Sequence, residues 1–140
     1  PPGATLIQCR VDSGTDSGAT WGPGLTVLWP DGRVVRLNIR SMGTFGVDDG
    51  RDFVFPGRTG PGETYFLRIL LEPDGVVAES SEDGEYWDFM HSYPRDHFPD
   101  DPVAVRLGKG GPGGRAEDYT EMARPGQCAL GDLRVYGPAG

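Results

Sequence analysis

Arginine and amide side chains recur on the polar faces of the predicted strands and are the groups best suited to holding a ligand. In residues 33–40, three apolar side chains at alternate positions leave the polar ones together on the other face. Guanidinium and amide groups are planar and form paired hydrogen bonds with carboxylates and sugar hydroxyls. The candidate ligand-binding set on strands is Arg36, Asn38, Arg40 and Arg68, with Arg106 on a comparable face.

Two aromatic residues extend this hypothesis. Trp21 and Tyr93 lie in or beside predicted loops, where their rings offer stacking area for a sugar. Trp87 alternates with Phe89, which favours a core position for Trp87. The arginines also have an explanation without a ligand, because they could pair across strands with Glu63, Glu72 or Glu79. Both interpretations stay open.

The two histidines do not suggest a metal centre. His91 and His97 are six residues apart across Pro94, which is not a usual zinc spacing, and no third ligand is evident. They are better interpreted as loop residues, with His91 placed to hydrogen-bond a sugar hydroxyl. No G-x-S-x-G motif for a nucleophilic serine is present.

Acidic loops raise the question of calcium. Asp48, Asp49 and Asp52 lie in one short segment, and carboxylate oxygens on a turn are ligands that calcium prefers. The segment lacks the spacing of an EF-hand. The preference of Asp and Gly for turns explains it without a metal. The sequence therefore implies no cofactor, and structural calcium is the alternative.

Cys9 and Cys128 are the two cysteines of the chain and lie near its opposite ends. Their spacing fits neither a zinc site nor a C-x-x-C redox pair. A structural disulfide and two buried free thiols are the alternatives. A disulfide would indicate an oxidising compartment.

Composition limits the partners. The chain has 140 residues, 21 acidic against 13 basic, for a net charge of −8. Nucleic acids and anionic membranes both require a cationic surface, so neither is an expected partner. No apolar run approaches the length of a membrane span. The chain begins Pro1-Pro2-Gly3 without Met, which suggests a domain excised from a larger protein.

The fold class follows from short alternating segments separated by turns. Strand-like alternation recurs from residue 5 to residue 136, and three Asp-Gly pairs, at 31–32, 74–75 and 83–84, each separate two such segments. Asp-Gly favours type I′ hairpin turns. The spacing predicts one all-β domain over residues 1–140, a sandwich or barrel. The predicted core is Val35, Leu37, Ile39, Leu67, Ile69, Val103, Val105, Leu107 and Leu133.

Three segments carry a family resemblance. They are the strand with Leu67-Arg68-Ile69, the run Ser81-Glu82-Asp83-Gly84-Glu85-Tyr86-Trp87, and the closing strand Leu130–Tyr136. Together, over about residues 63–137, they resemble the concanavalin A-like lectin/glucanase superfamily, especially laminin-G-like modules of bacterial extracellular proteins. The resemblance implies a jelly roll of two curved antiparallel sheets with about ten strands. It also implies that the first and last strands are neighbours, which would bring Cys9 near Cys128.

The resemblance also bears on activity. The related glucanases carry an E-x-D-x-x-E strand, whereas the nearest segment here, Glu79–Glu85, puts its middle carboxylates in a hairpin turn. In this superfamily the concave sheet or its rim loops often hold a carbohydrate. The expected function is therefore a non-catalytic carbohydrate-binding module of a larger secreted bacterial protein, and its partners are a polysaccharide or oligosaccharide and the neighbouring domains. An extracellular adhesion or structural domain and a small glycoside hydrolase are the alternatives.

Overall fold

The computed structural model describes residues 3–14, 22–40, 44–58, 63–108 and 129–137, without the side chains of Arg40 and Arg58. Ten strands and one 3-10 turn make up this part of the chain. They are β1 (Leu6–Asp12), β2 (Gly24–Leu28), β3 (Val34–Arg40), β4 (Thr44–Asp48), β5 (Phe53–Arg58), β6 (Thr64–Leu71), β7 (Gly75–Ser81), β8 (Asp88–Pro94), η2 (Arg95–His97), β9 (Ala104–Gly108) and β10 (Ala129–Tyr136).

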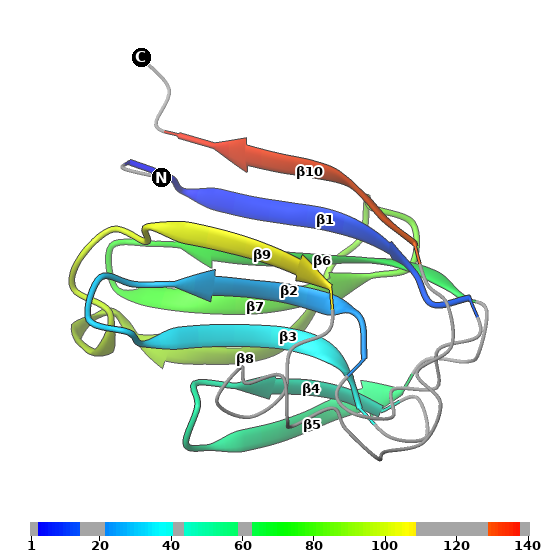
Figure 1. Cartoon of the computed structure of the whole chain (residues 1–140), viewed down its shortest axis with the longest axis horizontal. Coiled ribbons are helices and arrows are strands. Elements are labelled where there is room, and N and C mark those ends of the chain that lie inside the picture. The colour runs from blue at the N-terminus through cyan, green and yellow to red at the C-terminus, as the bar shows by residue number, and fades with distance from the viewer. Residues whose placement is uncertain (1–2, 15–21, 41–43, 59–62, 109–128, 138–140) are drawn as a thin grey trace.

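The strands form two antiparallel sheets of five (Figure 1). The first sheet has the order β10-β1-β6-β7-β8 and the second β5-β4-β3-β2-β9. This confirms the predicted all-β sandwich. The first and last strands are neighbours, with Leu6 opposite Tyr136 and Asp12 opposite Ala129. Within the described ranges, no helix is long and apolar enough to cross a membrane.

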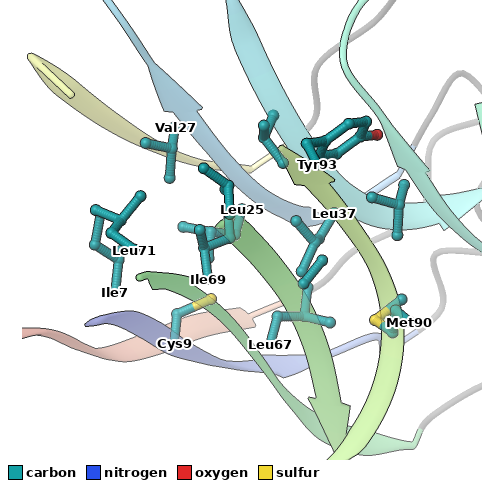
Figure 2. Packing of buried hydrophobic residues seen from close by; sticks show 14 of the residues in the cluster. Ile7, Cys9, Leu25, Val27, Leu37, Leu67, Ile69, Leu71, Met90 and Tyr93 are labelled. Atoms are coloured by element: carbon teal, nitrogen blue, oxygen red, sulfur yellow. The ribbon is translucent and has the colours of Figure 1, made fainter. Parts of the chain in front are cut away.

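The core lies between the sheets, where alternate side chains from both layers meet (Figure 2). Leu25, Leu37, Leu67 and Ile69 are all fully buried in it. The predicted core positions on β3 and β6 are confirmed, and Val105 and Leu107 pack partly buried against the core. The core positions predicted for Val103 and Leu133 were wrong, because these side chains are 59% and 46% exposed. Both belong to the edge of the sandwich, where a described neighbouring strand is present on one side only.

The predicted hairpins are present, but their turn type was wrong. Type I′ requires positive φ at both central residues, and of the described non-glycine residues only Asp132 has it. In the first hairpin Gly32 N–H donates to Trp29 O, and Gly32 has φ +84°. This is a three-residue loop with glycine in the left-handed region. In the second, Glu72 pairs directly with Gly75 around Pro73-Asp74.

Strand β4 was not predicted from the sequence. It is short, Gly46 interrupts its apolar pattern, and it ends in a carboxylate. Gly46 nevertheless faces Asn38 and Val47 faces Leu37 in the ladder with β3. Asp48, expected in an acidic loop, is therefore the last residue of a strand and is fully buried.

Cys9 is a buried free thiol on the inner face of β1. Figure 2 shows it directed into the core beside Ile69. Burial removes water from the thiolate and raises the pKa of Cys9 to about 12. Cys128 lies outside the described residues, so its disulfide with Cys9 stays a prediction. Ala129, the residue that follows Cys128, pairs with Asp12 and not with Cys9.

Truncating a central core residue should destabilise the fold far more than truncating an edge residue. We expect Ile69→Ala to lower the free energy of unfolding by about 2–5 kcal/mol, from lost transfer energy and the cavity left behind. The control Val103→Ala, at an exposed position, should cost under about 1 kcal/mol. Urea titrations of the two variants check this. Equal losses would mean that the assignment of the inner faces is wrong.

The buried thiol should make stability fall at alkaline pH. The Cys9 thiol ionises near its ordinary pKa of 9.0 in the unfolded chain but only near 12 in the native state. Between these values the native state holds a proton that the unfolded state has lost. The free energy of unfolding therefore decreases as pH rises, by at most about 1.4 kcal/mol per pH unit.

Urea titrations at about pH 8 and about pH 10.5 measure this loss, which should shrink in Cys9→Ala. A Cys9–Cys128 disulfide predicts the opposite result. It leaves no thiol at position 9 to titrate, and a thiol assay on the unfolded, unreduced protein would then find no free thiol.

Candidate functional site

The residues proposed from the sequence as one sugar site are divided between the two outer faces of the sandwich. Arg36 and Asn38 alternate with core residues on β3 of the second sheet, whereas Arg68 alternates with core residues on β6 of the first. The side chain of Arg40 and the whole of Trp21 lie outside the described residues. The described members of the set therefore do not converge on a single ligand.

Arg36 is engaged in a buried ion pair. Its Nε and Nη2 donate to Asp48 Oδ1 at 3.0 and 2.7 Å, and the two side chains are 8% and 0% exposed. Asn38 is also buried, at 3% exposed. Two buried charges must be paired and hydrogen-bonded to be tolerated. Arg36 therefore stabilises the second sheet, and its guanidinium is not presented to a ligand in solution.

Arg68 also has a partner, as the cross-strand interpretation predicted. Its Nε donates to Glu79 Oε1 at 2.7 Å, and its guanidinium carbon lies 4.0 Å from the centroid of the Trp87 ring. This cation–π contact places Trp87 on the outer face of the first sheet, half-buried. The core position inferred for Trp87 was wrong, because Phe89, with which it alternates, lies opposite Glu79 on the outer face and is 64% exposed.

Tyr93 and His91 belong to β8 and contact each other edge to face at 4.8 Å. Tyr93 is buried and also contacts Phe98, which in turn packs on Trp29. Burial raises the pKa of Tyr93, and the negative charges of Asp49, Asp48 and Asp52 raise it further. Tyr93 is thus a core aromatic and does not offer its ring at the rim. His91 is half-buried.

The acidic segment is held by its own turn. Asp48 Oδ1 accepts from Arg36 and from Gly50 N–H, and Asp49 Oδ1 accepts from the N–H groups of Arg51 and Asp52. Burial acts to raise the pKa of Asp49, but the two backbone donors outweigh it and lower that pKa. Asp52 is exposed. In the described ranges, no group of three or more His, Cys, Asp or Glu side chains could hold a metal ion.

A cleft opens between the two sheets where β4, β6 and β8 begin and β5 and β7 end, and we call it the lateral cleft. Its volume is about 230 Å³. The rings of Phe45 and Tyr65, 5.1 Å apart and edge to face, line it, and Phe89 lines it while remaining 64% exposed. The remaining lining residues are Pro56, Gly57, Glu63, Thr64, Ser80, Ser81, Glu82, Asp88 and Met90.

The chemistry of the lateral cleft combines aromatic carbon with oxygen. Its lining includes three carboxylates and three serine or threonine hydroxyls, and no Arg or Lys is among the described lining residues. Carboxylates accept hydrogen bonds, and serine and threonine hydroxyls both donate and accept them. The cleft is therefore suited to a ligand rich in hydroxyl or ammonium donors that has one apolar face.

The hairpin between β7 and β8 is a rigid wall of this cleft. Ser81 Oγ accepts from Gly84 N–H at 2.8 Å, and Asp83 Oδ1 accepts from Glu85 N–H at 2.8 Å and Tyr86 N–H at 3.0 Å. The bond from Tyr86, then that from Glu85, lowers the pKa of Asp83. Asp83 is occupied as a turn residue, as the sequence predicted, and Glu82 beside it borders the cleft.

Sequence reasoning missed the lateral cleft because its walls come from five strands, β4 and β5 of the second sheet and β6, β7 and β8 of the first. Its contributors are separated by up to 45 positions, from Phe45 to Met90. Phe89 was the one local signal. It is a large apolar residue that follows a carboxylate, Asp88, at the start of β8, and it is exposed to solvent.

Comparisons with known proteins support the fold and no more. No protein-family model matches the chain, and no curated protein matches it. Among solved structures, it is similar to a functionally unknown protein from Saccharomyces cerevisiae, with a TM-score of 0.58 and 18% identity. The likeness covers 100% of this chain and 72% of the yeast chain. No catalytic family is indicated.

Breaking the buried ion pair should destabilise the second sheet strongly. In Asp48→Asn the Arg36 charge stays buried without a carboxylate, so we expect a loss of about 3–5 kcal/mol in the free energy of unfolding. The double variant Arg36→Met with Asp48→Leu removes both charges and should recover most of the loss. Urea titrations of both variants test this. A loss under about 1 kcal/mol in Asp48→Asn would show that the pair is hydrated.

Proposed function

We propose that this chain is a non-catalytic carbohydrate-binding module and that the lateral cleft is its binding site. The observation that supports this proposal is the combination of Phe45, Tyr65 and Phe89 with three carboxylates and three serine or threonine hydroxyls around one opening. A sugar ring has an apolar face that stacks on aromatic carbon and a rim of hydroxyls that donate to carboxylates. The volume, about 230 Å³, is small for a ligand pocket and suits one sugar residue.

The ligand class differs from that expected from the arginines. Arg36 and Arg68, if their guanidinium groups were available, would favour an acidic glycan, because guanidinium pairs with carboxylates. Both are paired with carboxylates, and the described cleft lining carries acceptors without Arg or Lys. We therefore propose neutral glycans or glycans with amino groups, and we expect uronate-rich or sulfated glycans to be repelled.

The module would belong to a larger secreted protein, as the resemblance implied. The glycoside hydrolase alternative keeps one supporting observation, since Glu82 and Asp88 border the same cleft. Glycosidases place two carboxylates across a bound sugar. The adhesion or structural-domain alternative requires no sugar in the cleft.

Binding should depend on Phe89 and Glu82. Calorimetric titration with neutral, amino-containing and acidic oligosaccharides identifies a ligand. Phe89→Ala and Glu82→Gln should each weaken its binding about tenfold, which corresponds to about 1.4 kcal/mol. The matched controls are Phe53→Ala, an exposed phenylalanine outside the cleft lining, and Glu85→Gln, in the same hairpin but outside that lining. They should bind as the wild type does.

Three outcomes would contradict parts of this proposal. Wild-type binding that is unchanged in both cleft variants would place the site elsewhere. Absence of binding to every glycan would favour the adhesion or structural alternative. Release of reducing ends from a bound glycan, lost in Glu82→Gln or Asp88→Asn, would establish the hydrolase.

A further inference from the structure

The large apolar side chains that the described residues expose fall into two groups at opposite edges of the sandwich. Phe53, Phe55, Tyr86 and Phe89 lie on or beside β5 and β8, and of these four Phe89 lines the lateral cleft. The other four are Val103, next to β9, and Leu133, Val135 and Tyr136 of β10, each at least 41% exposed. The proposed function uses Phe89 of the first group and gives the second group no role.

Strand β10 has the properties of an edge that can accept another strand. It has eight residues and no proline, whereas β5 contains Pro56, β8 ends in Pro94 and β9 has five residues. Proline and short length are common means of protecting an edge from pairing. Leu71 N–H donates to Thr5 O, so the carbonyl of Thr5 points from β1 toward β6. The backbone groups of the next residue, Leu6, point to the opposite side of β1, toward Tyr136 of β10. Backbone alternation then leaves those of Leu133 and Val135 directed away from β1.

The charges of β10 match those of a second β10 running antiparallel to it. Asp132 and Arg134 flank Leu133, and both project to the outer face of the first sheet. There Asp132 lies 3.7 Å from Arg10, and Arg134 is opposite Gln8. If a two-fold axis passes at Leu133, Asp132 of each copy faces Arg134 of the other, and the two Leu133 side chains meet. A symmetric interface of this kind repeats each contact twice.

We propose that this chain forms a symmetric dimer through antiparallel pairing of β10 with β10 of a second copy. The pairing joins the two first sheets into one continuous sheet and covers Leu133 and Val135. Two Asp132–Arg134 pairs, with opposite charges directly across the strands, fix the register. The left-handed backbone of Asp132, with φ +51°, interrupts the ladder of β10. The pairing is therefore short, and the dimer should be weak, with a dissociation constant in the micromolar range or above.

Charge reversal tests the register. In Arg134→Glu, carboxylates face each other across the two-fold axis, and in Asp132→Lys, cations do. Each variant alone should have a dimer dissociation constant at least tenfold higher than the wild type. Mixing the two variants in equal amounts pairs the reversed charges and should restore dimer formation as a heterodimer. Sedimentation velocity over a concentration series measures all three samples, and circular dichroism confirms that each variant is folded. Arg106→Glu, an exposed arginine on β9, is the matched control and should dimerise as the wild type does.

Restoration in the mixture is a result that a merely structural role of either residue would not produce. The proposal is overturned if the wild-type chain stays monomeric up to about millimolar concentration, beyond the range of weak interfaces. It is also overturned if Arg134→Glu dimerises as well as the wild type, or if the mixture stays monomeric while both variants are folded.

Discussion

The rest of the structure depends on one constraint: each strand has a single face to bury, and the two sheets must bury theirs against each other. Because side chains alternate along a strand, a slip of one residue would move a whole set of core residues to the surface. Leu67 and Ile69 of β6 are fully buried and share one core cluster with Leu25 and Leu37 of the second sheet (Figure 2). This packing orients every outer-face residue, including the arginines, away from the core.

The same constraint explains why the fold could be predicted from the sequence and the site could not. Alternation is a local property, so the strands other than β4, the hairpins and the core positions on β3 and β6 could be inferred without knowing which strands are neighbours. Pairing between strands is not local. Arg36 of β3 lies opposite Asp48 of β4, the strand that had not been predicted. Arg68 of β6 lies opposite Glu79 of β7, and the register of the hairpin that joins these strands sets the contact. Val103 and Leu133 show a related limit, because alternation cannot reveal that a strand lies at an edge.

The charged side chains differ in whether a neighbouring charge neutralises them. The outer-face cations Arg36 and Arg68 each lie within 2.7 Å of a carboxylate oxygen, which neutralises them locally. Glu82 and Asp88 border the lateral cleft, whose described lining includes no Arg or Lys. Screening by salt limits the distance over which surface charges interact to about 8–10 Å. The net charge of −8 therefore matters less to a ligand than the charged side chains that line the cleft. A chain rich in arginine on its strands can thus present an anionic binding surface.

The lateral cleft and strand β10 share no residue, and this separation links the two proposals. The described lining of the cleft comes from β4 to β8 and their connections, and β10 lies at one end of the first sheet. Pairing through β10 would therefore leave both clefts open. A single cleft that holds one sugar residue binds weakly, because its contact area is small. Two clefts on one rigid dimer could engage the same polysaccharide or a glycan surface, and the second binding event would then be intramolecular. Its effective concentration could raise the overall affinity by about 10²–10⁴ without any new contact, provided that the glycan spans both clefts. The proposed weak dimer and the small cleft are thus compatible with each other and with the proposed recognition of repeated sugars on an extended ligand.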